Sequence, residues 1–201
     1  MSDFTQAAVA DAIAHQEITH PNSVYGSSLT PTAGALWAIV HMHHGFIEAA
    51  ANTNPGSFYV QTNLEATGEN WTTVAQFTVT NATPVIENMT ATEPIGETVM
   101  AVASTTGFAA NDYVYIQDVG TAADSEWHQV DIIVGNTSID LTEGLVVAKD
   151  TSDNIFSDAE NFAMKLDLSG VARWRVIYKA EGGTGANVAI WVRFIEVTDF
   201  E

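Results

Sequence analysis

Two clusters of side chains in this sequence have residue types that can bind a metal ion. His41 and His43 are two residues apart in a strand-like segment, so both side chains would lie on one side of the strand. A site there needs a third ligand, for which His20 or Glu48 is the candidate. The alternative is that these histidines line a polar strand end or a subunit contact.

The second cluster is an acidic loop that resembles a calcium site in composition, formed by Asp150, Asp153, Asn154 and Asp158. Its spacing does not follow the EF-hand pattern, because no glycine stands at the turn and no glutamate closes the loop. A solvated linker is the favoured interpretation. We therefore assign no metal site and no cofactor from the sequence.

Signals for catalysis are weak. The chain has no cysteine, which excludes disulfides, Cys–zinc sites and thiol chemistry. The segment Tyr25-Gly26-Ser27-Ser28 follows a loop, so it does not form the strand-to-helix turn of a nucleophilic serine. Four of the five tryptophans lie in apolar strand patterns, which favours core packing over sugar-binding platforms; the five are Trp37, Trp71, Trp127, Trp174 and Trp191. We predict no catalytic residue and no enzyme activity.

Charge narrows the classes of partner. From Met1 to Ala148 the chain has no lysine or arginine but 16 Asp and Glu residues, and its formal net charge is −19. Such a surface should repel nucleic acid and anionic membranes, so we expect neither as a partner. No apolar run reaches the roughly 18 residues that span a bilayer. The first residues also lack the basic start of a secretory signal, so we expect synthesis in a cytoplasm.

These side chains need elements to position them, and the periodicity predicts a mainly β protein. A helix is predicted over residues 4–16, because Phe4, Ala8 and Ile13 fall near a 3.6-residue spacing. Beyond it the apolar residues alternate, which predicts half-buried antiparallel strands at 35–43, 71–79, 162–168, 171–179 and 186–197. Residues 71–79 should place Trp71, Thr73, Ala75, Phe77 and Val79 on one face. Residues 171–179 should place Arg173, Arg175 and Lys179 opposite Trp174, Val176 and Tyr178.

The middle of the chain has shorter strands and closer turns. Five short strands, at 97–103, 112–117, 126–134, 138–141 and 145–148, are typical of a small β-barrel, with linkers at 84–95 and 150–160. The sequence thus predicts a discontinuous antiparallel β-sandwich with an inserted barrel. Its parts would be an N-terminal helix or arm (1–21), a host sandwich (22–83 and 160–201) and the barrel with its linkers (84–159).

The barrel segment carries a recognisable series of turns. It contains Ser104-Thr105-Thr106-Gly107-Phe108, then Asn111-Asp112 before an apolar strand, then the hairpin from Ile133 to Leu141. This series resembles a small β-barrel module of tailed-bacteriophage structural proteins. Asn111 stands where that module usually has glycine, a mild departure because asparagine also adopts positive φ. The resemblance implies a structural role in a virus particle, with no catalytic residues.

We therefore expect a virion structural protein, assembled in the host cytoplasm, that decorates the exterior of a capsid. Its expected partners are the major capsid protein and copies of itself, in trimers or other small oligomers. Candidate contact residues are Phe4, Ala8, Ile13, Arg173, Arg175 and Lys179. The N-terminal helix either packs on its own sandwich or reaches a neighbouring subunit. Alternatives are a tail or neck component and a carbohydrate-binding adhesin that uses exposed tryptophan.

Overall fold

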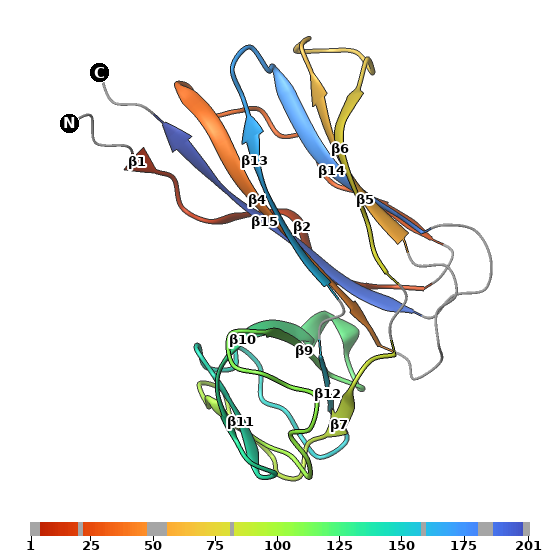
Figure 1. The fold of residues 1–201 in the computed structure, drawn as a ribbon, viewed down its shortest axis with the longest axis vertical. Helices are drawn as coiled ribbons and strands as arrows, with labels where there is room; N and C mark the ends of the chain where they lie inside the picture. The colour runs from red at the N-terminus through yellow and green to blue at the C-terminus, as the bar shows by residue number, and fades with distance from the viewer. Residues whose placement is uncertain are drawn as a thin grey trace.

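The computed structural model describes residues 5–19, 22–47, 56–80, 83–157, 160–180 and 187–198. This part of the chain is mainly β and antiparallel, as the alternation predicted, with one short 3-10 helix, η1 (Ala122–Asp124). Its strands form a two-sheet sandwich and, at one end of it, a small barrel (Figure 1). The described residues include no helix that is long and apolar enough to cross a membrane.

The first sheet of the sandwich has a long central strand, β15 (Val188–Thr198), which pairs with β4 (Ala35–Phe46). On its other side β15 pairs with β1 (Thr5–Gln6) and β2 (Ala10–Ile18), and β13 (Glu160–Asp167) pairs with β4. The second sheet has the order β3 (Ser23–Tyr25), β14 (Arg173–Ala180), β5 (Gly56–Asn63) and β6 (Thr72–Thr78).

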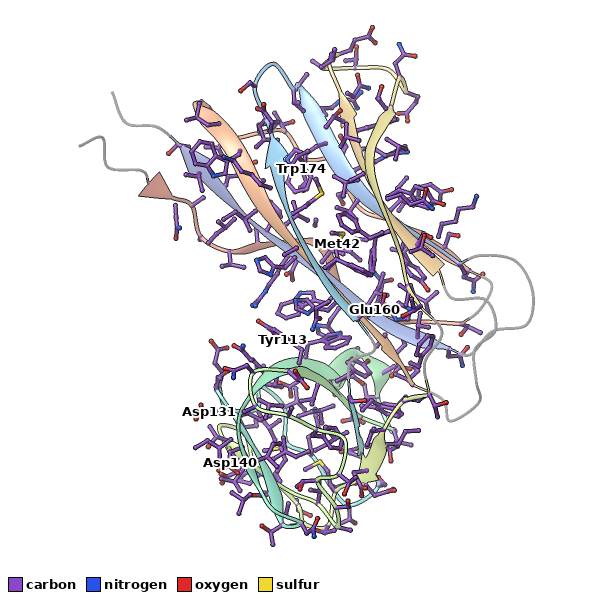
Figure 2. The ribbon with its side chains drawn as sticks, viewed as in Figure 1. Met42, Tyr113, Asp131, Asp140, Glu160 and Trp174 are labelled. Atoms are coloured by element: carbon purple, nitrogen blue, oxygen red, sulfur yellow. The ribbon has the colours of Figure 1, made fainter. Side chains whose placement is uncertain are left out.

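The sandwich core follows from strict alternation on these strands. Val40 and Met42 of β4 are fully buried, and so are Trp174 and Val176 of β14. Figure 2 shows Met42 and Trp174 between the two sheets. Apolar side chains on alternate positions thus cover each other across the sandwich, as expected for two sheets packed face to face.

The barrel is built from one contiguous stretch of chain. Its strands have the order β7 (Ile86–Asn88), β12 (Asn154–Ser157), β9 (Tyr113–Gln117), β10 (Glu126–Val134), β11 (Ser138–Leu141) and β8 (Val99–Ala101). A bridge from Met89 to Val102 joins the end of β7 to the end of β8 and closes the ring. Inside lies a separate apolar core that includes Met100, Ile116 and Ile139.

The predicted N-terminal helix is wrong, because residues 5–18 contribute β1 and β2. The register of β2 against β15 shifts on both sides of the Ile13–Val192 pair. These irregularities allow the neighbours Ala12 and Ile13 to be buried together, at 5% and 3% exposure. A bulge breaks the two-residue period of a strand, and here the broken period imitates helical spacing.

Three details of the middle region also differ from the prediction. The two predicted linkers contain strands of the barrel, β7 and β12, while residues 145–148 form no strand. Strand β6 is bulged, since Val60 pairs with Ala75 but Gln61 pairs with Thr73. Thr73 consequently lies beside Gln61 on the outer face of the sheet, and the prediction of one common face for residues 71–79 is wrong.

The turn chemistry was predicted correctly. Asn111 has a φ of 71° and Gly107 has a φ of 91°, both in the left-handed region. Asparagine and glycine are the residues that adopt this region at least cost. The two positions fix the turns that lead into β9.

Candidate functional site

The surface where the barrel meets the sandwich holds a cluster of aromatic side chains with ionisable groups beside it. We call it the seam, and its apolar members are Ile47, Tyr115, Trp127, Phe156 and Ala189, with Tyr113 and Trp191 packed against them. The ring of His43 lies between Tyr113 and Trp191, at centroid distances of 4.2 and 5.3 Å. Figure 2 shows Tyr113 at the junction of the two bodies. The barrel thus covers one end of the outer face of the first sheet.

A glycine makes this close approach possible. A Cβ at Gly45 would lie 3.1 Å from Cη2 of Trp127, which is tighter than ordinary van der Waals contact. Gly45 pairs with Ala189, so both strands present little side chain beneath the indole. Trp127 is 7% exposed. It is therefore a packing residue of the seam, and its buried indole leaves no face for stacking on a sugar.

Hydrogen bonds also join the two bodies across the seam. The hydroxyl of Tyr115 and the amide of Gln117 both donate to Glu17 on β2, at 3.1 and 2.9 Å. Arg193 on β15 donates to the hydroxyl oxygen of Tyr113 at 2.5 Å. Burial raises the pKa of Tyr115 above its ordinary value, so its hydroxyl stays protonated and acts as a donor.

The two central histidines are buried and neutral. Burial lowers the pKa of His43 to about 4, although its hydrogen bond to Asn161 opposes this shift, and it lowers the pKa of His44 to about 3. On the opposite face of β4, His44 shares a 3.2 Å hydrogen bond with the hydroxyl of Tyr178. These histidines are parts of two packed cores.

The described residues of the two clusters that were considered as metal sites do not come together in the structure. His41 and His43 share a face of β4, but His41 is exposed and His43 is 1% exposed beneath the barrel. His20, Glu48 and Asp158 lie outside the described residues. Across the described ranges no group of three or more His, Asp or Glu side chains is arranged to hold a metal ion. The carboxylate of Asp153 instead accepts hydrogen bonds from the backbone of Val119 and Asp150.

A buried ion pair lies in the barrel wall next to the seam. The carboxylate of Glu126 lies 3.1 Å from Nζ of Lys149 and 2.9 Å from Nε2 of His128. It also accepts the backbone N–H groups of Val146 and Val147 at 2.8 and 2.9 Å. These amides bond to a side chain rather than to a neighbouring strand, which explains why the strand predicted at 145–148 does not form.

The electrostatics of Glu126 are those of a structural group. Burial favours its neutral form, but the hydrogen bonds from His128, the two amides and Lys149 outweigh burial and lower its pKa to about 2. A carboxylate with this pKa remains ionised near neutral pH and is a poor general acid or base. The hollow beside it, about 240 Å³ in volume, is lined by Asp11 and His15 of β2 and by Glu126 and His128 of β10. The most buried carboxylate in the lining of this hollow is that of Glu126, and its oxygens already bind the loop that contains Val146 and Val147.

The predicted basic residues share one face of β14, as the alternation indicated. Arg173, Arg175 and Lys179 lie on the outer face of the second sheet, while Trp174, Val176 and Tyr178 are buried. Trp71 lies under both guanidinium groups, at 4.9 Å from Arg173 and 4.1 Å from Arg175.

Beside these cations lies a hollow of about 330 Å³ whose walls include Tyr25, Tyr59 and Ile177. These three residues were not predicted from the sequence as contact residues. The alternation along β5 and β14 indicates which of their residues face outward. It does not indicate that the two strands pair, and it is this pairing that brings Tyr59 and Ile177 together.

Of the remaining candidate contact residues, Ala8 and Ile13 lie apart from this face. Ile13 belongs to the sandwich core and Ala8 is exposed between β1 and β2. Phe4 lies outside the described residues. The described residues Ala10–Ile18 therefore pack on their own sandwich as β2.

The described residues thus form a mainly β protein made of a sandwich and a barrel. The ionisable side chains at the seam take part in packing the two against each other. No family model matches the chain, and no curated protein is similar to it. Among solved structures it is similar to a structure of infectious bursal disease virus strain Gx, with 11% identity and a TM-score of 0.26 over 99% of this chain. The chain spans 42% of that chain.

It is also similar to VP17, a capsid protein of bacteriophage P23-77, with 9% identity, a TM-score of 0.19 and coverage of 97% of this chain and 96% of VP17. Both structures are viral. Both TM-scores are too low to show a shared fold, so neither likeness assigns a function to this chain.

Proposed function

We propose that this chain is a non-enzymatic structural protein of a virus particle, located on the capsid exterior as a decoration protein. The observation that carries the proposal is the segregation of charge between its two bodies. Between residues 83 and 157 the sole lysine or arginine is Lys149, which is 1% exposed and paired with Glu126. The barrel surface thus presents carboxylates, whereas the exposed lysine and arginine side chains of the described chain lie on the sandwich.

The seam fixes the position of the acidic barrel relative to the sandwich. Packed aromatic rings and the bonds from Tyr115, Gln117 and Arg193 hold the barrel in a fixed position on the sandwich. A sandwich that attaches to a lattice of capsid subunits would therefore hold every barrel at the same height and orientation. A dense layer of acidic barrels repels other particles and keeps the assembly soluble.

The partners in this proposal are the major capsid protein and neighbouring copies of the chain, assembled in the host cytoplasm. The resemblance of the barrel turns to a module of phage structural proteins supports the class of assembly. Tyr115, Glu126 and His43 have packing roles that need no substrate, which supports a function without catalysis.

The test uses particles of the virus that encodes the chain, prepared with and without its gene. Purified protein is added back to the deficient particles, which are then sedimented and imaged by electron microscopy. We expect saturable binding to heads, with a copy number that matches the capsid lattice. A protein of similar size and net charge serves as the control for non-specific binding. Binding confined to tails or necks would replace the decoration role, and absence of binding to any part of the particle would refute the virion proposal.

A further inference from the structure

The outer face of the second sheet forms a continuous cationic and aromatic surface. One row across the strands contains Tyr25, Ile177, Tyr59 and Gln76, and the next rows contribute Lys179 and Arg175. Ile177 lies at the base of the hollow at 6% exposure, while Tyr25 at its edge is 67% exposed. No Asp or Glu stands in these rows, although the exposed Glu69, in the loop before β6, lies 3.9 Å from Arg175. We call this surface the cationic face, defined by Tyr25, Tyr59, Arg175, Ile177 and Lys179.

The barrel carries a surface of the opposite charge. Ile132 of β10, Asp140 of β11 and Val99 of β8 lie side by side in register, because Ile132 pairs with Asp140 and Asp140 pairs with Val99. Ile132, Val134 and Val99 are 52%, 44% and 40% exposed, although Ile139 and Met100 beside them are fully buried in the barrel. We call this surface the acidic ledge, defined by Val99, Asp131, Ile132, Val134 and Asp140.

The two surfaces are directed away from each other within one molecule. Figure 1 shows β14, β5 and β6 at the upper right of the molecule and β10 and β11 at the lower left. Figure 2 shows Asp131 and Asp140 along the left side of the barrel, below the sandwich. The cationic face therefore meets an acidic ledge only when a second molecule supplies it.

Charge selects among the ways in which two copies can pair. A net charge of −19 makes copies repel each other in most orientations. A symmetric pair of cationic faces would place Lys179 and Arg175 against the same residues, and a symmetric pair of ledges would oppose Asp131 and Asp140. Of the three pairings of these surfaces, only the unlike one brings opposite charges together.

We infer that the cationic face of one copy binds the acidic ledge of the next, in a head-to-tail contact between identical chains. Ile132 and Val134 enter the hollow between Tyr25 and Tyr59, and Asp131 and Asp140 pair with Arg175 and Lys179 at its rim. The contact has the apolar centre and polar rim of a specific protein interface. Because it is heterologous, it produces rings or rows of copies rather than closed dimers.

This inference deepens the proposed function and takes its setting from it, because attachment to a lattice brings copies side by side. Pairs of exposed charges contribute little individually, so the contact between free molecules is weak. When neighbours are held on one surface, the effective concentration of the ledge is high, and the same weak contact forms.

The test is a charge exchange between two variants of the full chain. One carries Asp131→Lys and Asp140→Lys, so that both of its surfaces are cationic; the other carries Arg175→Glu and Lys179→Glu. Sedimentation velocity over a concentration series at low salt should show self-association of the wild type. Each variant alone should associate at least tenfold more weakly, and an equimolar mixture should recover wild-type association, because each ledge again meets an unlike face. Added salt should weaken association in every case.

Controls separate a specific contact from a change in net charge. Asp112→Lys with Glu143→Lys alters exposed carboxylates outside the ledge, and Lys165→Glu alters an exposed cation on the other sheet; both variants should associate as the wild type does. Circular dichroism checks the folding of every variant. If the Arg175→Glu/Lys179→Glu chain does not fold, the neutral Arg175→Gln/Lys179→Gln chain replaces it and should still show weakened association.

A wild type that remains monomeric at every concentration, or a mixture that recovers nothing, would overturn the inference. Binding of an anionic polysaccharide to the cationic face, with no association between copies, would overturn it as well. Binding to capsids is measured separately. If copies attach to particles but do not contact one another, the head-to-tail contact is refuted and the proposed function stands. If copies associate with one another but do not attach to particles, the proposed function is refuted and the contact stands.

Discussion

Acidification should destabilise this protein through two adjacent histidines on β4. His43 is 1% exposed and His44 is fully buried, and burial lowers their pKa values to about 4 and about 3, from 6.5 in an unfolded chain. Since the folded pKa values are the lower ones, the unfolded state binds protons first as the pH falls. The stability that the neutral histidines provide is complete above pH 6.5 and is lost as the pH falls toward 4 and then 3.

The magnitude follows from the size of these gaps. One pKa unit corresponds to about 1.4 kcal/mol. About pH 5 lies roughly 1.5 units below the unfolded pKa and above both folded values, so each histidine should cost about 2 kcal/mol and the pair about 4 kcal/mol. In a chain of this size, that loss should lower the melting temperature by about 10 °C.

The assay is urea unfolding followed by tryptophan fluorescence, at about pH 7.5 and about pH 5. His43→Phe and His44→Phe should each remove about half of the difference in unfolding free energy between the two pH values, and the double variant should remove most of it. Val60→Ala, a truncation in the sandwich core that also contains His44, should lower stability at both pH values and leave the difference intact. The reasoning is refuted if the double variant keeps the full pH dependence.

Three further substitutions test particular contacts. Glu126→Gln leaves the buried ammonium of Lys149 without its counter-charge and should cost about 3–5 kcal/mol in urea unfolding, with most of the loss recovered when Lys149→Met is added. Gly45→Val should displace Trp127 at the seam and cost about 1–3 kcal/mol, seen as a shift in tryptophan emission and faster proteolysis between the two bodies. Asn111→Val should cost about 1–3 kcal/mol by differential scanning calorimetry, because a β-branched residue is strained at a φ of 71°, whereas Asn111→Gly should be nearly neutral.

The strands with one buried face could be predicted from the sequence because their period survives in the fold. Residues 162–168 alternate between apolar and polar side chains, and β13 occupies Glu160–Asp167 with the same alternation in burial. The common face of Arg173, Arg175 and Lys179 was predicted correctly for the same reason. The need for positive φ at Asn111 followed from residue type alone.

Elsewhere, β-bulges interrupt the two-residue alternation on which the predictions were based. At Ile13 the register shift buries two successive residues, and at Thr73 it moves the side chain to the opposite face. A bulge depends on the strand with which its own strand pairs, here β15 and β5. The sequence of the bulged strand alone therefore does not predict it.

The seam could not be predicted because it joins segments that are distant in the chain. His43, Tyr113 and Trp191 come from three separate strands, and nothing near any one of them in the sequence indicates the other two. Of the partners of Glu126 only His128 is near it in the sequence, since Lys149 and the amides of Val146 and Val147 belong to a loop about 20 residues further along. These residues can be recognised as one cluster only when the packing of the barrel on the first sheet is known.

The order of the strands along the chain has a consequence for biosynthesis. Every strand of the barrel lies between β7 and β12, so a ribosome delivers that whole unit before β13, β14 or β15 emerges. Until then β4 lacks both of the strands with which it pairs and β5 has only β6, so their apolar sides are not covered by the later strands. The nascent chain carries acidic residues and no lysine or arginine up to Ala148. Mutual repulsion between such unfinished chains keeps their sticky strands apart during the interval in which they are most prone to aggregate.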